Sequence, residues 1–303
     1  MAATKKKSGK SSKAKSGAAN KAVAAKGGAK RAAPKQAASP AKRSAPAGAK
    51  GKFVTIGDVT LEVERRGSGK PLLLLYSEEA LELEAPFLDA LAKRYELIIP
   101  SPPGFGRSNR PDWITSTDDM AYIYLDLIEK LGLKKLPVVG FSLGGWLAAE
   151  MATKDDSFIS KLVLVDPYGI KVGGPLERDI QDFWTLHPDK VMKLKWADPE
   201  KGKRDYPSMP EQQLEIIARN SESFARFCWE PYMHNPKLKH RLHRIQVPTL
   251  LMWGKNDGIV TTDYGAAYKK LIPGAKLVSI AKAGHYPHIE QPAAFVETLR
   301  SFL

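Results

Sequence analysis

The stretch Leu136-Pro137-Val138-Val139-Gly140-Phe141-Ser142-Leu143-Gly144 decides the fold prediction. It begins with a short apolar run, which is typical of a strand buried on both faces of a parallel sheet. A G-x-S-x-G pattern follows directly and leads into a helical run over 143–153. A serine on such a tight strand-to-helix turn holds its hydroxyl at the edge of the sheet. The sequence therefore predicts Ser142 as a nucleophile, the simpler alternative being a serine that caps a Gly-rich helix start.

Strand-like and helical runs alternate on both sides of this turn. Apolar and polar residues alternate over 53–56 and 59–64, which predicts an antiparallel hairpin around Gly57-Asp58. Further strands are expected at 71–76, 97–99, 136–141, 159–165, 247–253 and 276–280, and helices at 115–131, 143–153, 263–271 and 293–303. This order predicts an α/β fold with a mostly parallel central sheet and helices on both faces.

A stretch over about 168–244 interrupts the alternation. It lacks short apolar strands and is rich in aromatic and charged residues, so we interpret it as a helical cap inserted between two strands. Such an insertion would cover the crevice where open α/β sheets bind ligands. Phe141, Trp184 and Trp229 are candidates for contacts with an apolar substrate. The alternative is that the aromatic residues of the cap form its own core.

Residues 1–52 differ in composition from the rest of the chain. They hold 15 Lys and Arg and no acidic residue, whereas residues 53–303 hold 32 basic and 33 acidic residues. A segment of this composition is predicted to be a disordered tail. Its charge would bind nucleic acid or another polyanion without sequence preference, and a solubilising spacer is the alternative. It lacks the apolar core of a signal peptide.

The location and partners follow from a few further observations. No stretch reaches the roughly 18 apolar residues that a membrane span needs, so none is expected. The single cysteine, Cys228, fits a reducing compartment, and a cytoplasmic location is expected, with nucleoid or polyanion association through the tail. No metal-ligand set or dinucleotide fingerprint occurs, so no cofactor or metal is expected. The sequence carries no signal for an oligomeric state.

The chain supplies a base and an orienting acid for Ser142. A serine hydroxyl needs both near neutral pH. Asp257 follows the strand-like run 247–253 through Gly254-Lys-Asn256, and His285 follows the run 276–280 through Ala283-Gly284. Both lie just beyond strand ends, at the same sheet edge as Ser142. Asp166, after the run 159–165, is a rival acid, and His288 is the nearest rival base.

These motifs jointly resemble the α/β-hydrolase superfamily, in its serine-nucleophile branch with a helical cap, from Phe53 to Leu303. The likeness rests on the runs Pro103-Gly-Phe-Gly-Arg-Ser108, Gly140-Phe-Ser-Leu-Gly-Gly145, Trp253 to Asp257, and Ala283-Gly-His285 with Pro287-His-Ile-Glu-Gln-Pro292. It implies a Ser142–His285–Asp257 triad and an oxyanion hole built from the backbone N–H of Leu143 and, by position, of Glu78.

The sequence departs from its relatives at two points. Relatives usually begin the oxyanion loop with His-Gly, but here it reads Tyr76-Ser77-Glu78-Glu79, and Ser101 stands where relatives often carry Asp. The altered loop raises the alternative of a weakly active binding or regulatory protein on the same fold.

The expected activity is hydrolysis of a small, fairly apolar carboxylic ester by a carboxylesterase-like enzyme. C–C bond hydrolysis of the meta-cleavage type is the alternative, which Tyr286 makes less favoured because biphenyl-type C–C hydrolases carry tryptophan there.

Overall fold

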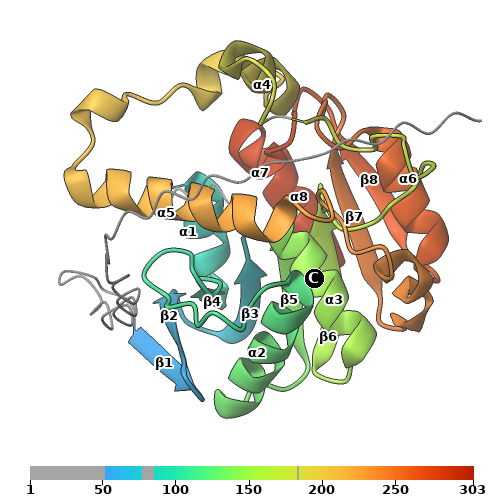
Figure 1. Cartoon of the computed structure of the whole chain (residues 1–303). Coiled ribbons are helices and arrows are strands. Elements are labelled where there is room, and N and C mark those ends of the chain that lie inside the picture. The colour runs from blue at the N-terminus through green and yellow to red at the C-terminus, as the bar shows by residue number, and fades with distance from the viewer. Residues whose placement is uncertain (1–51, 77–84, 183) are drawn as a thin grey trace, which may run out of the picture. The chain divides into compact units, whose positions relative to one another are not determined.

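The computed structural model describes residues 52–76, 85–182 and 184–303. Its centre is one eight-stranded sheet in the order β1-β2-β4-β3-β5-β6-β7-β8 (Figure 1). The hairpin strands β1 and β2 pair antiparallel, as do β2 and β4, and every other neighbouring pair is parallel. The strands are β1 (Lys52–Ile56), β2 (Val59–Arg66), β3 (Lys70–Leu75), β4 (Tyr95–Pro100), β5 (Leu136–Phe141), β6 (Ile159–Val165), β7 (Thr249–Gly254) and β8 (Lys276–Ile280).

Two hydrophobic cores lie on opposite faces of this sheet, because alternate residues of a strand point to opposite sides. Leu73 and Leu75 pack with helices α2 (Thr117–Lys130), α3 (Leu143–Lys154) and α6 (Thr262–Leu271). Leu72 and Leu74 pack on the other face with α1 (Pro86–Ala92) and α8 (Pro292–Phe302). The expected mostly parallel sheet with helices on both faces is confirmed.

The stretch between β6 and β7 carries helices, and its described residues add no strand to the sheet (Figure 1, yellow to orange). Its main helix, α5 (Glu211–Cys228), ends at the buried Cys228. The shorter helices are α4 (Pro188–Lys195), η1 (Pro199–Gly202), η2 (Tyr206–Ser208), η3 (Leu238–His240) and η4 (Leu242–Arg244).

Helix α5 is fixed over the loop that follows β4. Asn220 accepts a hydrogen bond from Gly106 N at 2.8 Å, and Ser223 Oγ donates to Gly104 O at 2.8 Å. Both polar side chains are buried, so these bonds satisfy groups that water does not reach. The loop motif recognised in the sequence is thus the platform on which the inserted helix rests.

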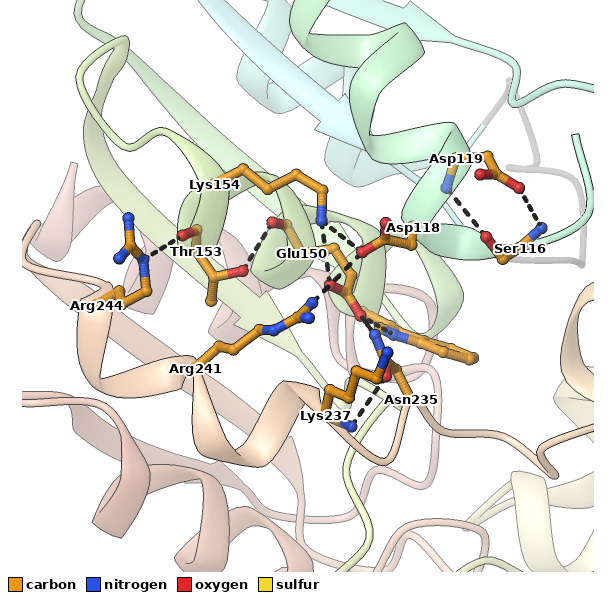
Figure 2. Close-up of polar contacts among 11 residues, drawn as sticks. Ser116, Asp118, Asp119, Glu150, Thr153, Lys154, Asn235, Lys237, Arg241 and Arg244 are labelled. Carbon is orange, nitrogen blue, oxygen red and sulfur yellow. Dashed lines mark hydrogen bonds and ion pairs between the residues drawn. The ribbon is translucent and has the colours of Figure 1, made fainter.

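A polar network joins the C-terminal part of the insertion to α3 (Figure 2). The carboxylate of Glu150, fully buried, accepts hydrogen bonds from Trp146 Nε1 at 3.2 Å and from Asn235 Nδ2 at 2.7 Å. Lys154 Nζ lies 3.6 Å from the same carboxylate and 2.6 Å from Asp118. Because α3 directly follows the predicted nucleophile, this network holds the C-terminal part of the insertion to the helix that positions Ser142.

The structure departs from the sequence-based expectation in three places. Lys52, expected in the tail, pairs with Val63 as the first residue of β1. Helices α1 and α7 (Pro287–Glu290) were not expected, because seven and four residues are too few to show a clear helical period.

Within the described residues, no helix is long and apolar enough to span a membrane.

Candidate active site

Ser142 stands at the turn between β5 and α3 with an unusual backbone. Its φ is 48° and its ψ is −112°, a conformation that L-residues adopt at a cost of about 1–3 kcal/mol. Hydrogen bonds to both of its backbone groups offset this cost: its N–H donates to Val165 O at 2.9 Å, and its carbonyl accepts from Trp146 N at 3.0 Å. The strain therefore persists because the surrounding sheet fixes the turn.

The glycines around Ser142 are required by close backbone contacts. A Cβ atom on Gly140 would lie 2.5 Å from Gly144 O, and one on Gly144 would lie 2.2 Å from Leu75 O. Real Cβ atoms do not approach backbone oxygens that closely. The G-x-S-x-G pattern is therefore explained here by crowding between β3, β5 and α3.

The structure brings the three predicted residues together in one hydrogen-bonded chain. Ser142 Oγ lies 2.6 Å from His285 Nε2, and His285 Nδ1 lies 2.7 Å from Asp257 Oδ2. The serine and histidine are 1% exposed and the aspartate 6%. An imidazole held between an acceptor on Nδ1 and a hydroxyl on Nε2 can remove the hydroxyl proton and retain it.

The orienting carboxylate is itself held by the backbone. Asp257 Oδ1 accepts hydrogen bonds from the N–H groups of Ile259 at 2.7 Å and Val260 at 3.1 Å. Its second oxygen is left to face His285 Nδ1. This arrangement fixes one carboxylate oxygen on the histidine and favours the tautomer with the proton on Nδ1.

Glu290 supports the loop that carries His285, a role that the sequence analysis did not predict although the residue lies in one of the family motifs. Its buried carboxylate accepts from Gly284 N at 2.6 Å, Asp198 N at 2.9 Å and Ala197 N at 3.3 Å. The backbone N–H of His285 also donates to Lys195 O at 2.7 Å. The inserted segment and the histidine loop are therefore joined directly beside the site.

The rival acid Asp166 lies close by but does not contact the histidine. Its Oδ1 accepts from Gly254 N at 3.0 Å, on the strand that leads to Asp257. Burial raises the pKa of the Asp166 carboxyl well above its usual range, and the nearby charge of Asp257 raises it further. The geometry thus puts Asp257, and not Asp166, in contact with His285.

The rival base His288 lies in the core on the face of the sheet that α1 and α8 cover. Its ring packs against Phe141 at 4.5 Å and Phe87 at 5.1 Å between centroids. Burial, with a smaller effect from His285, lowers its pKa to about 3. His288 is therefore a neutral packing residue in this structure.

Tyr168 is a further residue at the site that the sequence analysis did not single out. Its hydroxyl lies 2.9 Å from His285 Nε2, the same nitrogen that contacts Ser142. Its ring, fully buried, stacks on the imidazole with centroids 5.2 Å apart and planes 18° apart. The available signal was its place two residues after Asp166, beyond the end of β6, at the same sheet edge as Ser142.

A family model described as the alpha/beta hydrolase family matches residues 76–298 of this chain. The chain belongs to this family. The hydrolase is 27% identical over 236 residues to the 2-hydroxy-6-oxononadienedioate/2-hydroxy-6-oxononatrienedioate hydrolase of Paraburkholderia phymatum, over 71% of this chain and 79% of the relative. It is 25% identical over 256 residues to lipase 1 of Psychrobacter immobilis, over 78% and 77% of the two chains.

Solved structures agree on the fold. A meta-cleavage product hydrolase from Pseudomonas fluorescens IP01 superposes with a TM-score of 0.68 at 20% identity, covering 83% of this chain and 97% of the other. Likeness at this identity speaks for the architecture alone. The α/β-hydrolase fold expected from the sequence is thus confirmed, and the relatives named above are hydrolases.

The hydrolase places one predicted oxyanion donor beside the nucleophile. Leu143 begins α3, and the first N–H groups of a helix have no partner within the helix. The second predicted donor, Glu78, lies outside the described residues, as do Ser77 and Glu79. The chain that enters this loop passes close to the elbow, since a Cβ on Gly144 would lie 2.7 Å from Tyr76 N.

The three residues expected to contact substrate do not share one location. Phe141 packs under the sheet, against Phe87 and His288. Trp184 belongs to an aromatic group in the insertion, with ring centroids 5.4 Å from Phe224 and 5.6 Å from Trp229. Trp229 is 55% exposed, whereas Phe224 is buried 6.1 Å from the Tyr168 ring.

The hydrolase shows no metal-binding arrangement in the part of the chain that the structure describes. No group of three or more His, Cys, Asp or Glu side chains is placed there to hold an ion.

Proposed function

We propose that this hydrolase cleaves a small, fairly apolar carboxylic ester through an acyl-enzyme on Ser142. The observation that carries the proposal is the continuous contact from Ser142 Oγ through His285 to Asp257, at 2.6 and 2.7 Å. Nucleophilic catalysis by a serine requires a hydroxyl, a base and an orienting acid aligned in this order.

In the proposed acylation step, Ser142 Oγ attacks the ester carbonyl while His285 Nε2 takes its proton. Asp257 stabilises the imidazolium, and the N–H of Leu143 faces the developing oxyanion, with Glu78 N–H as the proposed second donor. The proton then passes to the leaving alkoxide, which departs as an alcohol. Water adds to the acyl-enzyme by the same transfers, releasing the acid and restoring Ser142.

The preference for an apolar substrate rests on the rings around the site. Tyr168, Phe224 and Trp184 form a series of aromatic contacts that leads from His285 into the insertion. Apolar walls with few polar groups are typical of small-molecule sites. We infer that Trp184 and Trp229 lie on the substrate side and that Phe141 supports the elbow from below.

The second candidate is C–C bond hydrolysis of a ring-cleavage product. It is favoured by the likeness to the hydrolase of Paraburkholderia phymatum, whose name denotes such a substrate. The same serine, histidine and aspartate would serve this reaction. Incubation with a ring-cleavage dienoate, followed by its absorbance, separates it from ester hydrolysis measured with short-chain esters.

The proposal is tested by reacting the purified protein with a fluorophosphonate and locating the adduct by mass spectrometry. We expect modification at Ser142 that Ser142→Ala abolishes and that His285→Ala slows by at least about a thousandfold. Absence of any adduct on folded wild-type protein would refute the enzymatic proposal and favour a binding protein on this fold.

The same assay separates the two acids. Asp257→Asn removes the acceptor that fixes the His285 tautomer, so we expect labelling to slow by roughly a thousand- to ten-thousandfold. Asp166→Asn keeps an oxygen for Gly254 N and should change the rate less than about threefold. A larger loss in Asp166→Asn than in Asp257→Asn would reverse the assignment.

A further inference from the structure

Tyr168 lies at the reacting atoms but has no part in the mechanism described so far. Its hydroxyl and Ser142 Oγ both contact His285 Nε2, at 2.9 and 2.6 Å. With the proton of the neutral imidazole on Nδ1, Nε2 offers a single lone pair. One hydroxyl at a time can donate to it, so Ser142 and Tyr168 cannot both donate to Nε2.

The position of Tyr168 is firmly determined by its surroundings. Its backbone N–H donates to Ser142 O at 3.3 Å, and its own carbonyl accepts from the Tyr268 hydroxyl. Its ring is stacked on His285 on one side and contacts Phe224 on another. The hydroxyl is therefore held against Nε2 by a buried, hydrogen-bonded backbone and by packing, as a preorganised catalytic group must be.

The space beside Nε2 next to the Tyr168 hydroxyl has a defined role in acyl transfer. After taking the serine proton, Nε2 must deliver it to the leaving-group oxygen, which therefore lies within hydrogen-bond distance of Nε2. In the second half of the reaction, the attacking water stands at the same place. The Tyr168 hydroxyl touches Nε2 from a position other than that of Ser142 Oγ, and so it adjoins this place.

We propose that Tyr168 is a catalytic residue whose hydroxyl donates a hydrogen bond to the leaving-group oxygen during acylation and to the attacking water during deacylation. This rests on the ester hydrolysis proposed above. The carbonyl carbon gains a bond to Ser142 Oγ and loses its bond to the leaving oxygen. The leaving oxygen takes its proton from His285, while Tyr168 keeps its own and only stabilises the charge.

The proposal also specifies the class of substrate. A hydrogen bond to the leaving oxygen matters most when that oxygen is basic, as in an alkyl alkoxide, and least when the leaving anion is already stable. Oxygen accepts such a bond better than sulfur does. Tyr168 therefore favours oxygen esters of ordinary alcohols over thioesters and activated aryl esters.

The test uses aryl methylphosphonates whose leaving groups are p-nitrophenol, phenol and p-methoxyphenol, with Ser142 modification followed by mass spectrometry. We expect Tyr168→Phe to slow labelling about ten- to a hundredfold with the two basic phenols, the range of a hydrogen bond to a charged group. With p-nitrophenol the change should stay below about threefold. In p-nitrophenyl acetate turnover, the variant should keep its initial burst and lose steady-state rate.

Tyr264→Phe is the matched control. Tyr264 is also a buried tyrosine, but its hydroxyl bonds the backbone of Ile170, at 2.9 Å from N and 2.7 Å from O. It should alter labelling by the same factor for all three leaving groups. If Tyr168→Phe does not fold, 3-fluorotyrosine at position 168 serves instead: as a stronger donor of nearly equal shape, it should speed labelling selectively for the basic phenols.

The outcomes separate this proposal from the function on which it rests. A Tyr168→Phe effect that is equal across the three phosphonates, or absent, would overturn the role of Tyr168 and leave ester hydrolysis standing. Wild-type protein that none of the phosphonates modifies would remove the proposed function itself, and the role of Tyr168 with it.

Discussion

Tyr76 and Ser101, two positions at which the sequence departs from the family pattern, contact each other. The Tyr76 hydroxyl lies 2.6 Å from Ser101 Oγ, and both side chains are buried. Burial raises the pKa of the Tyr76 hydroxyl above its usual range, so the pair remains neutral. Where relatives often carry His and Asp, this chain joins the ends of β3 and β4 by an uncharged hydrogen bond. Ser101 alone gave no indication of its partner, because the contact spans two strands.

At the residue scale, the sequence predicted the residues that act at strand ends and missed those whose role depends on packing. Ser142, Asp257 and His285 lie shortly after the ends of β5, β7 and β8, so chain order and strand edges were enough to place them at one site. Tyr168 and Glu290 reach the site through ring stacking and through bonds to a distant loop. These contacts depend on how the insertion returns over the sheet, which no local pattern encodes.

His288 gives a prediction for stability against pH. Its pKa is about 3 in the folded protein, while an unfolded chain has the ordinary value near 6.5. Between these values the unfolded state binds a proton that the folded state does not. The stabilisation is therefore complete above about pH 6.5 and is lost as the pH falls, by up to roughly 1.4 kcal/mol per pH unit.

The measurement is urea unfolding of wild type and His288→Phe at pH 7 and pH 5. We expect the wild type to lose roughly 2 kcal/mol more than the variant over this interval, because phenylalanine does not titrate. Other groups that titrate in the range act on both proteins and cancel in the comparison. An equal loss in the two proteins would show that His288 accepts its proton without unfolding.

At the scale of the element, strands were predicted to within one or two residues and short helices were not. The run 276–280 coincides with β8, and 136–141 with β5. Buried parallel strands are nearly continuous apolar runs, so their limits are visible in sequence. Helix α7 is a single turn and shows no apolar pattern that marks its limits. Its last residue, Glu290, nevertheless joins the insertion to the histidine loop through its carboxylate.

Glu290→Gln should weaken this junction. One carboxylate oxygen becomes an NH₂ group, which faces a backbone N–H donor that it cannot accept from. We expect the free energy of unfolding to fall by about 1–3 kcal/mol and labelling of Ser142 to slow, since Gly284 N precedes His285. Glu297→Gln, at an exposed position of α8, removes the same charge as a control. Equal unfolding midpoints for the two variants would contradict the supporting role.

At the scale of the whole molecule, the charge of the chain and its chemistry come from different segments. Residues 53–303 are close to neutral, and every described residue at the site lies in them. The tail of residues 1–52 lies outside the described residues except for Lys52, which opens β1 at the edge of the sheet. Strand β1 stands four positions from β5 in the sheet order, about 19 Å at ordinary strand spacing.

We predict that deleting residues 1–51 separates the two properties. The truncated protein should label at Ser142 within about twofold of the full chain, because no proposed catalytic group precedes β3. Retention on double-stranded DNA, measured at 50 and 200 mM salt, should be strong and salt-dependent for the full chain and lost on truncation. Unchanged retention, or labelling that collapses, would contradict the separation.

The burial of Cys228 makes the molecule convenient for spectroscopy. It is the only cysteine of the chain, it is fully buried at the end of α5, and a thiol in such surroundings reacts slowly. A cysteine introduced at Leu176, which is 98% exposed, would be the one accessible thiol. A fluorophore attached there reports on the inserted segment while the native cysteine stays in place, so its movement during turnover can be followed in an otherwise unaltered protein.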